Sequence, residues 1–264
     1  MKSYLVGFIA IILSVCVHAE IKSQVIEYTV DGENFTGYLA YDDQIQSKRP
    51  GILVVHEWWG HNDYVRQRAD QLAELGYTAF ALDMYGTGKV AQHPADAKKF
   101  MQAVLDNMPA AEQRFEAGYN ILRNHPSVES EQIAAIGYCF GGGTVLHMAR
   151  QGLDLDGVVS FHGILATDSP AKNGKVKAEL LVFTGADDPM VPSFQVDGFR
   201  EEMTDANVSF KLYSYPGVTH AFTNPAADEL GKRFNMPLAY DAAADADSWS
   251  KMREFLNEIF IQEK

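Results

Sequence analysis

Two early segments of the chain alternate apolar and polar residues, and shorter apolar runs follow them. Residues 25–30 and 35–41 show the alternation of half-buried strands, and Asp31-Gly32 between them is a typical hairpin turn. Compact apolar runs bounded by polar or glycine residues are typical of buried strands. Further strands are predicted at 51–56, 77–82, 132–137, 157–161, 180–184 and 208–215.

Segments with helical spacing lie between these strands. They predict helices at 63–75, 95–105, 110–123, 143–150, 194–206 and 241–261. Gly76 ends the first helix and Pro109 separates the second from the third. The aromatic residues of the last helix are interpreted as core anchors. Strands alternating with helices predict an α/β fold: a mainly parallel sheet, covered by helices on both faces, with the hairpin as an antiparallel edge.

The first 19 residues differ from the rest of the chain. Lys2 precedes an almost entirely apolar run at 4–17, and Val17-His18-Ala19 has the small residues of a signal-peptidase site. This pattern predicts a signal peptide at 1–19, cleaved before Glu20, and a secreted or periplasmic protein. A retained membrane anchor is the alternative, although the apolar run is short for a membrane span. Residues 20–264 have the length of a single domain.

Charge and cysteine content narrow the classes of partner and chemistry. The formal net charge of −13 disfavours binding to nucleic acid and to anionic membrane surfaces. We therefore expect a small-molecule partner and, after signal cleavage, no membrane association. Cys16 would be lost with the signal peptide, so Cys139 would be the only cysteine of the mature chain. A lone thiol in an oxidising compartment is expected to be either deeply buried or chemically useful.

The surroundings of Cys139 favour the second of these alternatives. Cys139 lies in Gly137-Tyr138-Cys139-Phe140-Gly141, between a predicted strand and a predicted helix. The pattern matches the nucleophile elbow G-x-S-x-G with sulfur in place of oxygen. Small residues two positions before and after a nucleophile fit a sharp strand-to-helix turn, and a helix N-terminus favours a thiolate. The Phe140 N–H is a candidate donor for an oxyanion hole. A buried cysteine in a glycine-rich turn is the alternative.

Candidate partners for the thiol follow other predicted strands. Asp187 and Asp188 come after the strand at 180–184, and His220 comes after the strand at 208–215. Nucleophile, acid and histidine in this order are typical of the α/β-hydrolase fold, in which these groups meet at the carboxyl ends of strands. The residues alone do not distinguish Asp187 from Asp188. His162 also follows a strand but precedes the acid, so we interpret it as a pocket or packing residue.

The loop after the strand at 51–56 holds a further candidate. Glu57 lies there in His56-Glu57-Trp58-Trp59-Gly60, and this loop supplies the second oxyanion-hole N–H in α/β-hydrolases, here expected from Trp58. A carboxylate at this place can hydrogen-bond a thiol and control its ionisation. A solvated loop glutamate is the alternative.

At these residues the chain resembles the dienelactone hydrolase family of α/β-hydrolases, over nearly the whole mature length. The motifs that carry the resemblance are His56-Glu57-Trp58-Trp59-Gly60, Asp83-Met84-Tyr85-Gly86, Gly137-Tyr138-Cys139-Phe140-Gly141-Gly142, Gly185-Ala186-Asp187-Asp188-Pro189 and His220-Ala221-Phe222. The resemblance implies a triad of Cys139, Asp188 and His220, and thereby selects Asp188 over Asp187. It also implies that Glu57 holds the resting thiol and helps the substrate to generate the thiolate.

The chain departs from this family in one respect. Members that open dienelactone use arginines to grip the substrate carboxylate, but the segments matched here, 85–88 and 222–224, contain none. An anionic diene lactone is therefore not expected as the natural substrate. Aromatic residues suggest an apolar pocket instead: Trp58, Trp59, Tyr85, Phe140 and Phe222.

Together these features predict a hydrolase of esters or lactones that forms a thioester on Cys139 and needs neither a cofactor nor a metal. A non-catalytic ligand-binding protein on the same scaffold is the first alternative, since a fold does not imply a function. A thiol redox sensor is the second alternative, but the mature chain would lack a resolving cysteine.

Overall fold

The structure, a computed structural model, describes residues 21–261; the expected signal peptide at 1–19 lies outside this range. The strands are β1 (Ile21–Val30), β2 (Glu33–Asp42), β3 (Arg49–Val55), β4 (Thr78–Leu82), β5 (Val128–Tyr138), β6 (Gly157–Phe161), β7 (Glu179–Gly185) and β8 (Phe210–Tyr215). The helices are α1 (Asp63–Glu74), α2 (Pro94–Leu105), α3 (Met108–Arg123), α4 (Phe140–Gln151), α5 (Ser193–Asp205), α6 (Ala227–Phe234) and α7 (Ala242–Ile261).

The strands form one sheet in the order β1-β2-β4-β3-β5-β6-β7-β8. Strands β3 to β8 run parallel, whereas β1 and β2 pair antiparallel with each other and β2 pairs antiparallel with β4. The expected antiparallel hairpin at the edge of a mainly parallel sheet is therefore confirmed. Asp31 and Gly32 form its turn, both with positive φ, as a two-residue hairpin loop requires.

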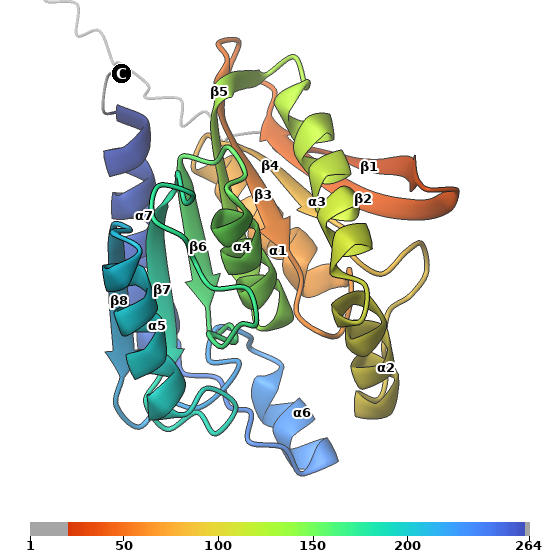
Figure 1. Cartoon of the computed structure of the whole chain (residues 1–264). Coiled ribbons are helices and arrows are strands. Elements are labelled where there is room, and N and C mark those ends of the chain that lie inside the picture. The colour runs from red at the N-terminus through yellow and green to blue at the C-terminus, as the bar shows by residue number, and fades with distance from the viewer. Residues whose placement is uncertain (1–20, 262–264) are drawn as a thin grey trace, which may run out of the picture.

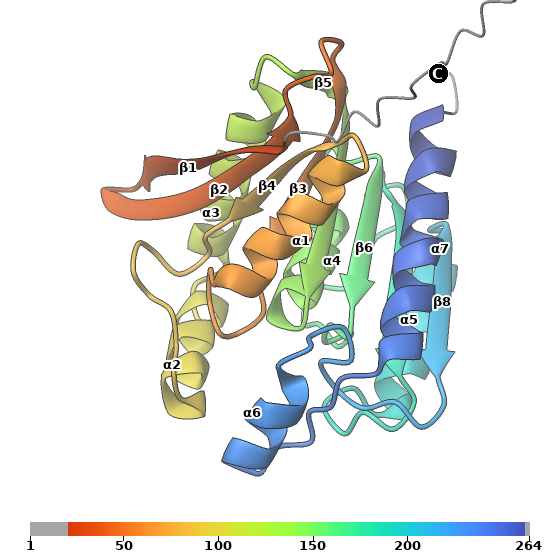
Figure 2. The ribbon, with the colours of Figure 1, turned by 180° about the vertical axis from the view of Figure 1, so that it is seen from behind.

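Helices cover both faces of the sheet. Helices α3, α4 and α5 lie on the face seen in Figure 1, and α1 and α7 lie on the opposite face, seen in Figure 2. Each face has its own apolar core, one built around Leu53, Phe80 and Phe115 and the other around Val54, Leu72 and Phe255. Adjacent strand residues such as Leu53 and Val54 thus point to opposite cores, which is why the central strands are continuously apolar.

Several predicted boundaries differ from the observed ones. The fourth helix begins at Phe140, three residues before the predicted 143, because glycines 141–143 lie inside its first turn. Helix α3 begins at Met108, since Pro109 is compatible with a first helical turn and the Asn107 side chain caps it. Strand β5 begins at Val128 instead of 132, and α6 was not predicted. None of the described helices has the length and hydropathy needed to cross a bilayer.

The carboxyl ends of β3, β5, β7 and β8 lie at one edge of the sheet. The parallel register shows this alignment. Val55 pairs with Gly137 and Phe161 pairs with Phe183, and these residues lie close to the carboxyl ends of β3, β5, β6 and β7. Helix α6 lies beyond this same edge (Figure 1). Loops that are far apart in sequence therefore converge there.

Candidate functional site

Cys139 occupies a sharp turn between β5 and α4. Its backbone has φ 53° and ψ −115°, in the positive-φ region that side-chain-bearing residues rarely adopt. The turn is very close-packed: a Cβ on Gly137 would lie 2.0 Å from the Gly141 carbonyl oxygen, and one on Gly141 would lie 2.3 Å from the Val55 oxygen. The two glycines therefore allow α4 to begin directly after the cysteine, with its N-terminus at the thiol.

Replacing Gly141 by alanine is expected to lower the free energy of unfolding by about 2–3 kcal/mol, because the new methyl group meets backbone and not a movable side chain. For a chain of this length that corresponds to a fall in melting temperature of roughly 4–12 °C, measurable by calorimetry. Gly143→Ala is the matched control, since its Cβ would lie 3.4 Å from the nearest atom, the Ile164 oxygen, which is an ordinary contact distance. Equal melting temperatures for the two variants would contradict this account of the turn.

His220 and Asp188 extend from Cys139 in a continuous line. His220 Nε2 lies 3.1 Å from Cys139 Sγ, and His220 Nδ1 lies 2.7 Å from Asp188 Oδ2. The second carboxylate oxygen of Asp188 accepts the Met190 N–H at 2.8 Å, which fixes its orientation. His220 and Asp188 are buried, whereas Cys139 is partly exposed. The loops after β5, β7 and β8 thus bring the three predicted triad residues into hydrogen-bonding contact.

The pKa of His220 is raised to about 10. Burial acts in the opposite direction, but the Cys139 sulfur and the Asp188 carboxylate stabilise the charged ring more strongly. These contacts therefore favour the imidazolium form of His220. It donates one hydrogen bond to the sulfur and the other to Asp188.

The structure separates the residues that the sequence left open. Asp188 is buried against His220, whereas Asp187 is exposed on the same loop. His162 is completely buried, and its ring packs edge-on against the His220 ring with centroids 5.2 Å apart. Burial lowers the pKa of His162 well below its usual value, and the His220 charge adds to this effect. His162 is thus a neutral packing residue behind the triad histidine.

Glu57 is buried beside this group and is held by Asn224. Asn224 Nδ2 donates to Glu57 Oε2 at 2.7 Å, while Asn224 Oδ1 accepts the Ala226 N–H at 2.9 Å, so the amide has one orientation. Burial raises the pKa of Glu57 to about 7, although the Asn224 hydrogen bond and the charge of His220 act to lower it. Glu57 therefore changes its charge close to neutral pH, and the solvated-loop alternative does not fit a side chain this buried.

Glu57→Gln is expected to stabilise the protein above pH 4.5, by an amount that grows until the pH reaches about 7. The ordinary pKa of a glutamate is 4.5, and that of the buried Glu57 is about 7. The contribution of Glu57 to the stability of the fold is therefore fully present below pH 4.5 and is lost as the pH rises through about 7. Glutamine stays neutral, so the variant should exceed the wild type by about 2–3 kcal/mol at pH 8.5 and match it at pH 4.5. Chemical denaturation at both pH values measures this. Glu116→Gln, at an exposed position of α3, is the control; a pH-independent difference for Glu57→Gln would contradict the raised pKa.

The two candidate oxyanion-hole residues, Phe140 and Trp58, lie in the turns that follow β5 and β3. Phe140 is the first residue of α4, so its N–H is one of the four that have no partner within a helix. Trp58 lies in the turn that the Gly60 N–H closes on the Glu57 oxygen at 3.1 Å. The Tyr85 hydroxyl donates to the Trp58 oxygen at 3.1 Å and holds this turn in place.

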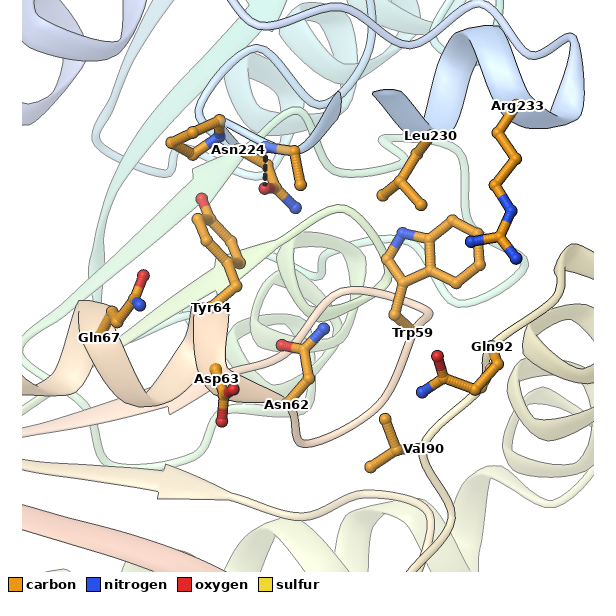
Figure 3. A pocket seen from close by; sticks show the side chains of 13 residues that line it. Trp59, Asn62, Asp63, Tyr64, Gln67, Val90, Gln92, Asn224, Leu230 and Arg233 are labelled. Atoms are coloured by element: carbon orange, nitrogen blue, oxygen red, sulfur yellow. Dashed lines mark hydrogen bonds between the residues drawn. The ribbon is translucent and has the colours of Figure 1, made fainter. Parts of the chain in front are cut away.

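The predicted pocket aromatics have different surroundings. Tyr85 packs against the Phe140 ring, with centroids 5.4 Å apart. Phe222 is completely buried between His162 and Tyr215, so it supports the His220 loop and does not face an open cavity. Trp59 lines a cavity of about 380 Å³ (Figure 3).

That cavity, the Trp59 cavity, lies between the loops after β3 and β8. Figure 3 shows Trp59, Tyr64 and Asn224 around it, with Arg233 of α6 at one side. Arg233 is exposed, and it comes from a helix that was not predicted. An arginine is therefore present near the site, although outside the two segments in which one was sought.

The sequence did not point to the hydrogen-bond network that holds the His220 loop. The Arg68 guanidinium donates to the Thr223 oxygen at 2.6 Å and to Asp245 at 2.7 Å. The Thr223 hydroxyl contacts both Tyr64 Oη, at 2.7 Å, and His162 Nε2, at 2.8 Å. One signal was available, since Arg68 interrupts the apolar face of α1. Asn224 had none, because its partner Glu57 lies 167 residues away in the chain.

Comparison with known proteins agrees with this geometry. The family model described as "Dienelactone hydrolase family" matches residues 35–260. A dienelactone hydrolase-like promiscuous phosphotriesterase from metagenomic libraries has a solved structure that is 31% identical, with a TM-score of 0.84 over 90% of this chain and 98% of that one. Protein usf of Aquifex pyrophilus is 29% identical over 89% of this chain and 98% of its own length.

A further relative, from Aquifex aeolicus, is provisionally named as a carboxymethylenebutenolidase. It is 25% identical, over 86% of this chain and 94% of its own length. The family match spans strands β3 to β8, the elbow and the loops that carry Asp188 and His220. The chain therefore belongs to the dienelactone hydrolase family of α/β-hydrolases.

Proposed function

We propose that this protein is an exported hydrolase of ester or lactone bonds in which Cys139 is the nucleophile. The observation that carries the proposal is the line of contacts from Cys139 Sγ through His220 to Asp188, at 3.1 Å and 2.7 Å. A nucleophile within reach of a base that a third group orients is the recognised arrangement for covalent catalysis. Membership of a hydrolase family supports the same reaction class.

Acylation begins with the thiolate form of Cys139. Its sulfur adds to the ester carbonyl carbon, and the carbonyl electron pair moves onto oxygen, where the Phe140 and Trp58 N–H groups would stabilise it. When the carbonyl re-forms, the bond to the leaving alkoxide breaks. The alkoxide takes the proton from His220 Nε2 and departs as an alcohol, leaving a thioester on Cys139. In a lactone the alcohol stays attached to the acyl chain.

Deacylation uses the same groups in reverse. Neutral His220 accepts a proton from water, and the resulting hydroxide adds to the thioester carbonyl. The tetrahedral intermediate expels the Cys139 thiolate and releases the carboxylic acid. Asp188 holds the imidazole ring so that Nε2 faces the reacting atoms in both halves, and it stabilises the imidazolium.

Trapping the acyl-enzyme tests this mechanism. Rapid acid quenching during turnover of p-nitrophenyl acetate, followed by peptide mass spectrometry, is expected to find one acetyl group on the peptide that contains Cys139. The label should disappear on mild hydroxylamine treatment, as a thioester does. Turnover with no label on Cys139, or with a label on another side chain, would contradict the proposal. A non-catalytic binding protein would show neither turnover nor label.

Export is the second part of the proposal and depends on residues 1–19. The basic Lys2, the apolar run and the Val17-His18-Ala19 site support it. Expression of the full chain in a bacterial host, with N-terminal sequencing of the periplasmic fraction, is expected to give a mature protein that begins at Glu20. Uncleaved protein in the cytoplasmic fraction would refute it.

A further inference from the structure

A second cavity, of about 300 Å³, has Phe140 in its wall. Its lining comes from α2, α3, α4 and the loop after β6: Met101, Val104, Leu105, Met108, Ala111, Phe140, Gly143, Thr144, His147, Arg150, Ile164, Ala166, Thr167, Asp168 and Ser169. Phe140 directly follows the nucleophile. Cys139 itself packs against the same apolar cluster as Met101 and Met108. We call this space the α2–α4 cavity.

From this arrangement we propose that the α2–α4 cavity binds the acyl group of the substrate, and that this group is an uncharged alkyl or aryl chain. The inference rests on the proposed function, because it takes Cys139 as the nucleophile and Phe140 as an oxyanion donor. It adds the substrate class, and it assigns the two sides of the scissile bond to two different spaces.

The position of His220 decides which side of the ester enters the cavity. The leaving alkoxide must lie at His220 Nε2 to receive its proton, so the alcohol part extends toward the His220 loop. The lining of the Trp59 cavity includes Asn224, Pro225 and Ala226, which continue that loop. None of the residues that line the α2–α4 cavity comes from the loops of His220 or Asp188. The acyl substituent, on the other side of the carbonyl, therefore points into the α2–α4 cavity.

The chemistry of the lining selects for an uncharged group. The polar side chains of the inner wall are already paired: Arg150 binds both carboxylate oxygens of Glu202 at 2.8 Å, His147 contacts Glu112 at 2.8 Å, and the Thr144 hydroxyl donates to the Phe140 oxygen at 2.9 Å. The lining thus offers no unpaired cation to a substrate carboxylate. The net charge of −13 opposes an anionic chain further.

The mouth of the cavity is also apolar. Leu105 and Ile164 are two of the few large apolar side chains that the described residues expose, at 42% and 39%, and both line this cavity. An acyl chain that covers them would remove apolar surface from water on both sides of the contact. Each buried methylene is expected to raise kcat/KM about fourfold until the cavity is filled.

A chain-length series tests the assignment. For p-nitrophenyl esters of acetate, butyrate and hexanoate, kcat/KM of the full protein should rise by about tenfold or more from the first to the last.

Ala111→Leu fills the cavity and should lower the hexanoate value about tenfold while acetate stays within about twofold. Leu105→Gln, at an exposed position where folding is not at risk, should lower hexanoate hydrolysis selectively by about threefold. Ala103→Leu, exposed on α2 and outside the lining, should change neither.

Two further arms define charge and direction. The p-nitrophenyl monoester of adipic acid has the six-carbon chain of hexanoate with a carboxylate in place of the terminal methyl group, and it should react at least about tenfold more slowly. Ethyl and hexyl acetate vary the alcohol instead, and Ala111→Leu should leave their ratio unchanged. An altered alcohol ratio, or equal rates for adipate and hexanoate esters, would overturn the inference.

The outcomes separate this inference from the proposed function. If acetate hydrolysis requires Cys139 but Ala111→Leu and Leu105→Gln leave the hexanoate-to-acetate ratio unchanged, the cavity assignment alone is wrong. If the wild type hydrolyses none of the esters, or hydrolyses them without Cys139, the proposed function fails and the assignment fails with it.

Discussion

Replacing Cys139 by alanine is expected to lower kcat/KM for p-nitrophenyl acetate by roughly 10⁵-fold. Without the sulfur no thioester forms, and His220 Nε2 loses its hydrogen-bond partner, the Cys139 Sγ at 3.1 Å. The backbone donors and the binding surfaces remain, and in triad hydrolases they leave a residual acceleration of about 10³- to 10⁴-fold over the reaction in water. Steady-state kinetics with protein free of host esterases measures the loss.

A folding control is needed because Cys139 has an unusual backbone conformation. Alanine keeps the Cβ and should leave the melting temperature within a few degrees, since the thiol is partly exposed. Cys139→Ser keeps a nucleophilic atom and tests the chemistry separately: it should be almost as inactive, because a hydroxyl is far less acidic than a thiol and is a weaker nucleophile. Wild-type rates in Cys139→Ala would remove the residue from the mechanism.

Asp188→Asn is expected to have the second largest effect, a fall in kcat of about 10²- to 10⁴-fold. The Asp188 side chain is fully buried and accepts from His220 Nδ1 at 2.7 Å. Asparagine removes the negative charge that supports the imidazolium, and its NH₂ group can face Nδ1 and select the wrong tautomer. The pKa of His220, raised to about 10 in the wild type, should fall. NMR titration of the histidine ring would measure this change independently of activity.

Asp187→Asn provides the matched control, one residue away on the same loop. Asp187 is exposed, and its backbone N–H binds the Val218 oxygen at 3.0 Å, an interaction that the substitution keeps. Its kcat and its His220 titration should both stay close to wild type. Equal losses in the two variants would mean that the loop as a whole matters, and that Asp188 has no specific role.

The arrangement of strands was predictable because each central strand is apolar on both faces. A strand such as β3 must be buried wherever it lies, so short apolar runs mark it clearly in the sequence. The boundaries at the elbow were less predictable. Three consecutive glycines suggest a loop, but here they form the first turn of α4. This turn packs so closely against β3 that a Cβ on Gly141 would lie only 2.3 Å from the Val55 oxygen. The preference of glycine for loops is overridden by close packing.

Helix α6 was not predicted for a related reason. No side chain caps its N-terminus, where Ala226 has helical backbone angles, so the usual signal of a helix start is missing. The helix depends on tertiary contacts instead, such as the packing of Phe234 on Trp59 with ring centroids 6.1 Å apart. It adds a wall and Arg233 to the Trp59 cavity.

The sequence by itself determined the fold class, the elbow, and the nucleophile and histidine of the proposed triad, because each is encoded by a local pattern at the end of a strand. It narrowed the acid to Asp187 or Asp188, and the family resemblance selected the second. Only the tertiary structure showed that Asp188 is the one facing His220, that Asn224 holds Glu57, and that an apolar cavity adjoins Phe140. These depend on contacts between distant segments, and the direction of a side chain in a loop is set by packing that no local pattern records.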